Sequence, residues 1–225
     1  MKLNLVTANG KRGIDFVPKT LIIVGFSGRD QEMVRRHIAE LTKMGVHPPD
    51  QTPAIYNLPP TLLTTAKEVT VQGDRTNGEV EYVVLQKDGE LYVTVGSDHT
   101  DRVLEREMIE KSKLVCPKII APEIWPYKDV ENHWDALQLS SYAQSERGME
   151  AYQEGGVAEI MRPQDLIGKI GAHGDGTAIF SGTVPLKGEA SFPSRFRLVM
   201  SDPVLRRSIT HEYVVNVTAA RGRSP

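Results

Sequence analysis

The sequence predicts an α+β fold in which β-strands dominate and helices are few and short. Short β-branched and apolar runs occur along the whole chain, and turn-forming pairs such as Asn9-Gly10 and Asn77-Gly78 separate them. The regular alternation of strand and helix that marks a doubly wound sheet is missing from this pattern.

The strands follow from these runs, each bounded by turn residues. Lys87-Asp88-Gly89 lies between two of them and predicts a β-hairpin. The predicted strands cover residues 20–26, 79–85, 91–95, 177–181, 195–200 and 209–217.

Helix start and stop signals predict helices over residues 30–44, 102–113 and 163–168. The first ends at Gly45, the second ends before Pro117, and the third begins at Pro163, a favourable first helical residue. We expect residues 1–60 to form a lead-in region with one strand and one helix, and residues 61–225 to form the β core.

Composition excludes several classes of function. The 225 residues carry 27 Lys and Arg against 29 Asp and Glu, so we expect neither nucleic acid nor a membrane as a partner. The single Cys116 excludes a disulfide framework and is most simply a small buried residue. The N-terminus lacks a signal-peptide pattern, which predicts a cytoplasmic location, and the tail 221–225 is expected to be a frayed end.

Known nucleotide and nucleophile motifs are also missing. The chain has no GxxxxGK[ST] run, no GxSxG elbow and no CxxC pair, and the glycines of residues 171–176 do not follow a strand.

Two carboxylates begin the strand 79–85. Glu79 and Glu81 share one face because they are two residues apart, and the strand is otherwise apolar on both faces. Buried carboxylates need compensation, which a hard divalent cation such as Mg²⁺, Mn²⁺ or Ca²⁺ would supply. The alternative is that both acids lie at a solvated strand end.

A second acidic group follows the next strand of the hairpin. Asp98 or Asp101 could cap the helix that follows, as could Thr100. Because the ends of antiparallel neighbours come within ~5 Å, Asp98 could equally converge on Glu79 and Glu81.

The first helix carries a candidate general base. Its apolar stripe consists of Met33, Val34, Leu41 and Met44, and His37 falls within that stripe. Glu40 lies one turn later, close enough to orient the imidazole. The alternative is that His37 is an ordinary core residue.

Taken in order, these segments resemble the fumarylacetoacetate hydrolase superfamily. The segments that carry the resemblance run from about residue 20 to 190: His37-Ile38-Ala39-Glu40, Thr52-Pro53-Ala54-Ile55-Tyr56, Glu79-Val80-Glu81, Ser97-Asp98-His99-Thr100-Asp101-Arg102, Lys111-Ser112-Lys113 before Pro117, Gln153-Glu154-Gly155, and Gly174-Asp175 with Ser181-Gly182-Thr183-Val184-Pro185.

The resemblance implies a twisted β-roll, usually a homodimer, with Mg²⁺ or Mn²⁺ held by Glu79, Glu81 and Asp98. It implies that His37, oriented by Glu40, activates water and that Lys111 or Lys113 adds positive charge. Substrate-side residues would be Tyr56, Arg102, Gln153 and Thr183.

The implied activity is hydrolysis of a C–C bond in an acylpyruvate or a similar β-diketo acid, through an enolate stabilised by the metal. Decarboxylation or dehydration of a sugar acid could use the same site. A binding protein for a small keto acid would need no base, and a purely structural β protein would need no metal.

The sequence departs from the family pattern at several places: His99 and Asp101 add polar groups beside the metal, and the match fades after residue 190. The segment after Asp98 is short, which leaves Lys111 and Lys113 as alternatives, and Val184 stands where proline is usual.

Overall fold

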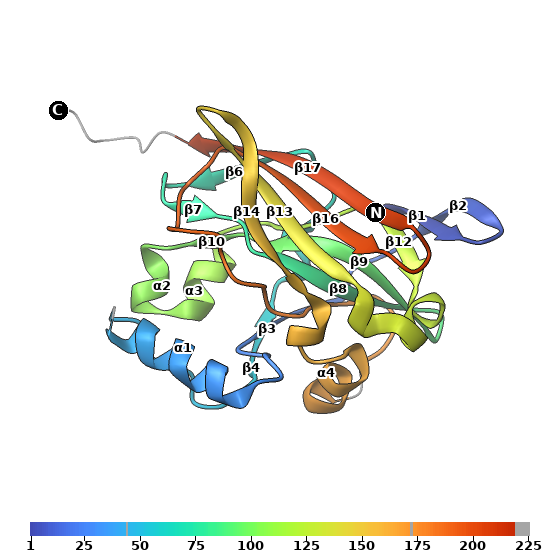
Figure 1. Ribbon diagram of the computed structural model, residues 1–225, viewed down its shortest axis with the longest axis horizontal. Helices are drawn as coiled ribbons and strands as arrows, with labels where there is room; N and C mark the ends of the chain where they lie inside the picture. Colours follow the sequence, from blue (N-terminus) through green and yellow to red (C-terminus); the bar gives the residue numbers. More distant parts are fainter. Residues whose placement is uncertain (44, 172, 219–225) are drawn as a thin grey trace.

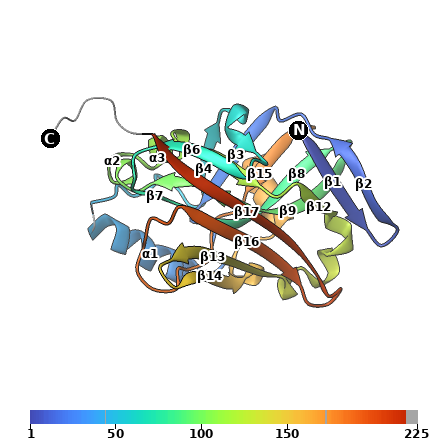
Figure 2. The same ribbon diagram turned by 90° about the horizontal axis from the view of Figure 1, so that it is seen from above.

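Two mixed β-sheets, one of ten strands and one of five, share a hydrophobic core in the computed structural model (Figures 1 and 2). The structure describes residues 1–43, 45–171 and 173–218. Met44 of the predicted first helix and the tail 221–225 lie outside these residues.

The ten-stranded sheet has the order β2-β1-β12-β9-β8-β15-β3-β4, and β11 joins it by pairing with β5 and β9. Its parallel pairs are β1 with β12, β3 with β15, and β5 with β11. The strands are β1 (Lys2–Thr7), β2 (Gly10–Asp15), β3 (Thr20–Gly25), β4 (Ala54–Leu58), β5 (Leu63–Thr64), β8 (Val80–Lys87), β9 (Glu90–Asp98), β11 (Lys118–Ile120), β12 (Glu123–Pro126) and β15 (Thr177–Phe180).

The five-stranded sheet has the order β14-β13-β16-β17-β6, and a short ladder joins β7 to β10. These strands are β6 (Glu68–Gln72), β7 (Thr76–Asn77), β10 (Thr100–Asp101), β13 (Gln138–Ser145), β14 (Gly148–Gly156), β16 (Arg195–Asp202) and β17 (Arg207–Thr218).

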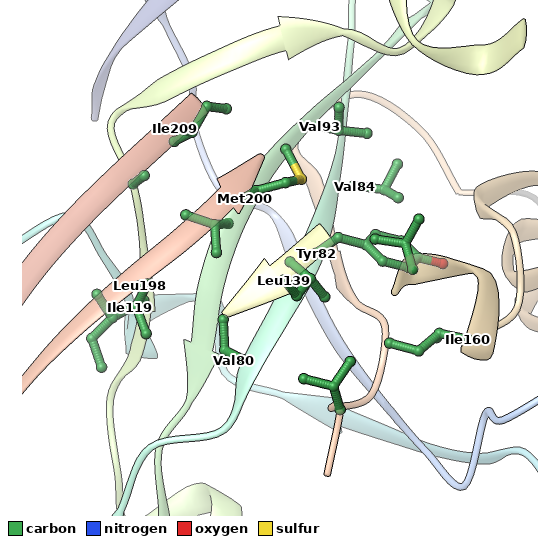
Figure 3. Close-up of a cluster of buried hydrophobic side chains, with 14 of the residues drawn as sticks. Val80, Tyr82, Val84, Val93, Ile119, Leu139, Ile160, Leu198, Met200 and Ile209 are labelled. Carbon is green, nitrogen blue, oxygen red and sulfur yellow. The ribbon is translucent and has the colours of Figure 1, made fainter. Parts of the chain in front are cut away.

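The core lies on both faces of β8, as the sequence predicts. Val80, Tyr82 and Val84 pack in one cluster with residues of the five-stranded sheet such as Leu139 and Met200 (Figure 3). The opposite face of β8 contributes Val83 and Leu85 to a second cluster. Because full burial of one such side chain contributes ~1.5–3 kcal/mol, this strand is held firmly in place.

The α-helices lie in the lower half of Figure 1. They are α1 (Gln31–Lys43), α2 (Leu104–Glu107), α3 (Ile109–Leu114) and α4 (Pro163–Ile170), with 3-10 turns η1 (Pro60–Leu62), η2 (Tyr127–Asp129), η3 (Glu131–Ala136) and η4 (Val157–Glu159). Within the described segments, no helix has the length and apolar character needed to cross a membrane.

The predicted helix over residues 102–113 is wrong as a single element. Asp101 caps its start by accepting hydrogen bonds from the backbone N–H groups of Val103 and Leu104. Met108 then adopts an extended conformation that divides α2 from α3. The break reorients the second half, so that Ser112 and Lys113 are buried.

The lead-in region of residues 1–60 supplies β1 to β4 and α1. Of these strands, β1 pairs with β12 and β3 pairs with β15, so two strands of this region join directly to later parts of the chain. The region therefore shares one sheet with the rest of the chain.

Candidate metal and substrate site

Three carboxylates converge at one end of the β8–β9 hairpin. One oxygen or more from each of Glu79, Glu81 and Asp98 lies within 4.8 Å of the others. The antiparallel register places Glu81 opposite Gly96, and the Asp98 N–H donates to the Glu79 carbonyl oxygen at 3.0 Å. The geometry that the hairpin predicts is therefore present.

Two glycines allow this close packing. A Cβ on Gly96 would lie 2.7 Å from both the Ile119 carbonyl oxygen and the Val83 side chain. Gly182 has φ +95°, and its N–H donates to Glu81 Oε2 at 2.8 Å. A side chain at either position would displace its neighbours, and at Gly182 it would also strain the backbone.

Three cationic side chains surround the acids. The ammonium group of Lys113 contacts Asp98 Oδ2 and lies 3.7 Å from Glu79 Oε2. Lys118 Nζ lies 2.8 Å from Asp98 Oδ1 and donates to the His99 carbonyl oxygen at 2.6 Å. Arg102 Nη2 lies 2.9 Å from Glu79 Oε1.

These cations set the protonation of two of the acids. Burial would raise the pKa of Asp98, but Lys113 and Lys118 outweigh it and lower that pKa to about 2. Burial would also raise the pKa of Glu79, but Arg102 and Lys113 outweigh it and lower that pKa below its usual value. Both side chains are therefore carboxylates at neutral pH.

Glu81 is the acid that the protein compensates least. Burial and then the charges of Asp98 and Glu79 raise its pKa well above the usual value, and Lys113 and the Gly182 N–H oppose this only in part. Glu81 therefore keeps its proton more readily than Asp98 and Glu79 do.

The donor set fits a hard divalent cation. All three side chains offer carboxylate oxygens, the ligands that Mg²⁺, Mn²⁺ and Ca²⁺ prefer. Asp98 Oδ1 has the Lys118 ammonium 2.8 Å away as its partner, so Asp98 would offer its other oxygen to the ion. Glu79, Glu81 and Asp98 could therefore hold the ion.

The structure distinguishes between the two predicted lysines. Lys111 is exposed, whereas the Lys113 side chain is only 7% exposed and faces the acids. Lys118 is a residue that the sequence reasoning missed, although a lone lysine before Ile119 and Ile120 is unusual in an apolar run. It lies directly opposite Asp98 in the β9–β11 ladder.

Arg102 is engaged in more contacts than the prediction anticipated. It pairs with Glu105 at 2.8 Å and donates through Nε to Asn77 Oδ1 at 2.6 Å, in addition to its contact with Glu79. The carboxylates of Glu79 and Glu105 overcome the effect of burial and raise the pKa of Arg102. In this structure the guanidinium positions Glu79.

The other predicted substrate-side residues lie at different depths. Tyr56 on β4 is half-buried; burial raises its pKa, and the nearby charge of Lys113 opposes the increase. Gln153 is buried and uses both amide protons, one to Thr183 Oγ1 and one to the Val184 carbonyl oxygen. Thr183 is exposed and donates to the Val80 carbonyl oxygen at 2.9 Å.

The predicted base lies on an exposed helix. His37 and Glu40 are both exposed on α1, whose one described buried residue is Val34. No hydrogen bond between His37 and Glu40 occurs in the part of the chain that the structure describes; the imidazole ring faces the Phe26 ring at 6.1 Å. The alternative of a buried core histidine is wrong, and the catalytic role stays a prediction.

A buried polar network supports the cluster from behind. His99, next to Asp98, bonds through its two ring nitrogens to Tyr213 Oη at 3.1 Å and Thr76 Oγ1 at 2.9 Å. Tyr213 Oη also bonds to Ser97 Oγ at 2.9 Å. Burial and the charge of Lys118 lower the pKa of His99 to about 3, so it remains neutral.

Comparison with known proteins identifies related families and folds. The model of the family described as protein of unknown function (DUF2848) matches residues 24–213. No curated protein matches the chain.

Solved structures resemble the chain over nearly its whole length. A candidate fumarylacetoacetate isomerase/hydrolase from Oleispira antarctica is 17% identical with a TM-score of 0.67, over 96% of this chain and 100% of that one. A yeast fumarylacetoacetate hydrolase family protein is 14% identical with a TM-score of 0.63, over 92% and 97%. A 2-keto-3-deoxy-D-arabinonate dehydratase complexed with magnesium and 2,5-dioxopentanoate is 18% identical with a TM-score of 0.62, over 96% and 79%. The resemblance and the expected β-roll are confirmed in the fold.

Proposed function

Because the chain belongs to the family described as protein of unknown function (DUF2848) and has the fold of fumarylacetoacetate hydrolase family proteins, we propose that it is a divalent-metal-dependent enzyme acting on small 2-oxo acids. The observation that carries this proposal is the convergence of Glu79, Glu81 and Asp98 within 4.8 Å at the end of a rigid hairpin. Mg²⁺ or Mn²⁺ is the expected ion, with Ca²⁺ as the alternative.

When bound, such an ion would polarise a carbonyl oxygen and stabilise negative charge as it develops on the substrate. The chain's own residues supply the remaining functions. Lys113 is the cation best placed to pair with a substrate carboxylate, since it lies at the acids and Lys111 does not. The half-buried Tyr56, within the field of Lys113, would line the substrate side.

Hydrolysis of a C–C bond in an acylpyruvate-type acid is the reaction that we place first. It requires a base to take a proton from water, and His37 with Glu40 is the pair available on α1. Because both side chains are exposed in this structure, the proposal requires α1 to bring His37 toward the cluster when substrate binds.

Dehydration of a sugar acid is the second candidate, ahead of a binding protein without turnover. The similarity to a dehydratase bound to magnesium and 2,5-dioxopentanoate favours it, and decarboxylation would use the same acids. A binding protein would need the cluster and Lys113 but no base, so it would bind a 2-oxo acid without turning it over. A cytoplasmic location and a homodimer belong to the same proposal.

The metal is tested by thermal unfolding. Mn²⁺ or Mg²⁺ should raise the melting temperature, because an ion that binds only the folded state stabilises it. Glu81→Gln should remove most of that increase while its amide oxygen can still accept the Gly182 N–H. Glu90→Gln, at the opposite end of the hairpin, is the matched control and should respond like the wild type. An undiminished response in Glu81→Gln would exclude Glu81 as a ligand.

The substrate class is tested with oxalate, which resembles the enolate of pyruvate. Oxalate should bind only in the presence of the ion and more tightly than a neutral diketone. Acylpyruvates, oxaloacetate and 2-keto-3-deoxy sugar acids should then be assayed for turnover. Oxalate binding that does not depend on metal would contradict the proposal even though the fold is right.

A further inference from the structure

The Lys113 ammonium lies where two of the acids meet. It contacts Asp98 Oδ2 and lies 3.7 Å from Glu79 Oε2, and among the described residues it is the one cation that pairs with two members of the cluster. Its charge also acts on Glu81. Lys113 therefore serves as the counterion of the whole cluster, whereas Lys118 and Arg102 each serve one acid.

The other two cations leave these oxygens free. Lys118 pairs with Asp98 Oδ1, and Arg102 pairs with Glu79 Oε1. Asp98 Oδ2 and Glu79 Oε2 pair with neither of these cations. Lys113 faces both oxygens, and Thr100 Oγ1 also donates to Glu79 Oε2 at 3.5 Å. A metal ion bound by both acids would use the same two oxygens and leave the outer ion pairs intact.

A metal ion and the ammonium group cannot share that position. Mg²⁺ binds carboxylate oxygens at ~2.0–2.1 Å, so an ion on Asp98 Oδ2 would lie within a few ångströms of the Lys113 nitrogen. Like charges at such a distance repel strongly in a buried site.

We propose that Lys113 is an exchangeable counterion: it neutralises Glu79 and Asp98 until a divalent ion binds, and then moves aside to meet an anionic ligand. The inference rests on the proposed function, because it assumes that the cluster binds a metal. Replacing one positive charge by two, with Lys113 still close by, would make the loaded site favourable for a carboxylate such as that of a 2-oxo acid.

A substitution beside a metal site usually weakens metal binding, but the exchange predicts that removing the Lys113 charge strengthens it. Lys113→Met keeps the length of the side chain and removes the charge that competes with the ion. The full-length variant should therefore bind Mn²⁺ at least about tenfold more tightly than the wild type, measured by isothermal titration calorimetry. Lys111→Met, two residues away and exposed, should bind Mn²⁺ like the wild type.

Oxalate binding should change in the opposite direction to Mn²⁺ binding in the same variant. Metal-dependent oxalate binding should weaken about tenfold or more in Lys113→Met, because the ammonium that pairs with the acid is gone. Tighter Mn²⁺ binding together with weaker oxalate binding is the expected signature. Mn²⁺ binding that is unchanged or weaker would overturn the exchange.

A measurement on the wild type does not depend on how the variant folds. Acetylation of Lys113 by an amine-reactive ester, followed by mass spectrometry, should be slow without Mn²⁺ and several times faster with it, since the ammonium leaves the carboxylates. Lys111 in the same sample serves as the reference and should not respond, and oxalate should slow Lys113 again. Labelling of Lys113 that Mn²⁺ leaves unchanged or reduces would overturn the exchange.

The two proposals fail in different ways. If the wild type binds Mn²⁺ and Lys113→Met binds it no more tightly, the exchange is wrong and the proposed function stands. If neither protein binds Mn²⁺, the metal site itself is wrong, and the exchange is wrong with it.

Discussion

The end of the β8–β9 hairpin and helix α1 carry the two halves of the proposed chemistry, and the protein holds them in opposite ways. Glu81, Asp98, Lys113 and Lys118 are buried, and ion pairs and backbone hydrogen bonds fix them. On α1, His37 and Glu40 are exposed, and the one described buried residue is Val34. The proposed metal ligands are thus part of the core, whereas the proposed base lies on a helix with few buried side chains.

This contrast shows where stability and activity should separate. A helix attached through few buried side chains can shift or open at a small cost in free energy, whereas a buried cluster of charges cannot. Substitutions on α1 should therefore change catalysis and leave folding intact. Substitutions in the cluster should change folding as well.

The largest effect is expected from His37→Ala. If His37 activates water, kcat should fall by roughly 10²–10⁴. The free energy of unfolding should change by less than about 0.5 kcal/mol, because the side chain is exposed. Turnover of the preferred substrate and urea unfolding give the two numbers, with the exposed His47→Ala as the control that alters neither.

Glu40→Gln should cost less than loss of the imidazole, because it alters the orientation of the base without removing it. Undiminished turnover in His37→Ala would favour a reaction that needs no base from α1. A wild type that binds oxalate but turns over none of the acids tested would favour a binding protein.

The second effect tests the other side of the comparison. Lys118→Met should lower the free energy of unfolding by about 1.5–3 kcal/mol, because Asp98 loses one of its two buried cationic partners and the His99 carbonyl oxygen loses its donor, while Lys113 still pairs with Asp98. Lys128→Met is the matched surface control: its ion pair with Glu90 is exposed, so it should cost about 1 kcal/mol or less.

Equal losses in the Lys118 and Lys128 variants, measured by urea unfolding, would mean that the cluster is more solvated than its burial indicates. The contrast with α1 would then disappear.

The hairpin and the acid cluster were predictable because local patterns encode them. Residues i and i+2 of a strand share a face, and a short turn fixes the register of a hairpin. The proximity of Glu79, Glu81 and Asp98 could therefore be predicted from the sequence. Lys118 could not, because its place depends on β11 pairing with β9 across a segment that includes α2 and α3. Nothing in the local sequence specifies that pairing.

Two hairpins at the sheet edges were harder to predict. The β1–β2 hairpin was missed because β2 is rich in glycine and charge, a composition that an edge strand tolerates. The β13–β14 hairpin was missed because β13 contains polar serines in place of β-branched residues, although it lies between β14 and β16. The burial of α1 was predicted wrongly. Its apolar stripe predicts a buried face, yet Met33 is 58% exposed.

The smallest effect concerns pH and separates Glu81 from its two acidic neighbours. Burial and the neighbouring acids raise its pKa in the folded protein, so between pH 4.5 and that higher pKa the folded state binds more protons than the unfolded chain. Stability due to Glu81 should therefore fall as the pH rises through this window.

The other shifted groups act in different directions. Asp98, with a pKa of about 2, gains stability only as the pH rises toward 3.8 and contributes no slope above that. The lowered pKa of His99, about 3, and the lowered pKa of His211 make stability rise with pH up to about 6.5. A single pH profile would mix these contributions, so Glu81 must be isolated by difference.

The measurement is urea unfolding of the wild type and Glu81→Gln from pH 4.5 to 8 with a chelator present. The free energy of unfolding of the wild type minus that of the variant should decrease as the pH rises. The total decrease should be about 1.4 kcal/mol for each tenfold difference in the proton affinity of Glu81 between the folded and unfolded states. With saturating Mn²⁺ in place of the chelator this decrease should disappear, because the ion binds the deprotonated carboxylate and Glu81 is then charged in both the folded and the unfolded states above about pH 4.5. A difference that is flat with the chelator would mean that burial and the neighbouring acids do not raise the pKa of Glu81. A decrease that Mn²⁺ leaves unchanged would mean that no ion binds Glu81.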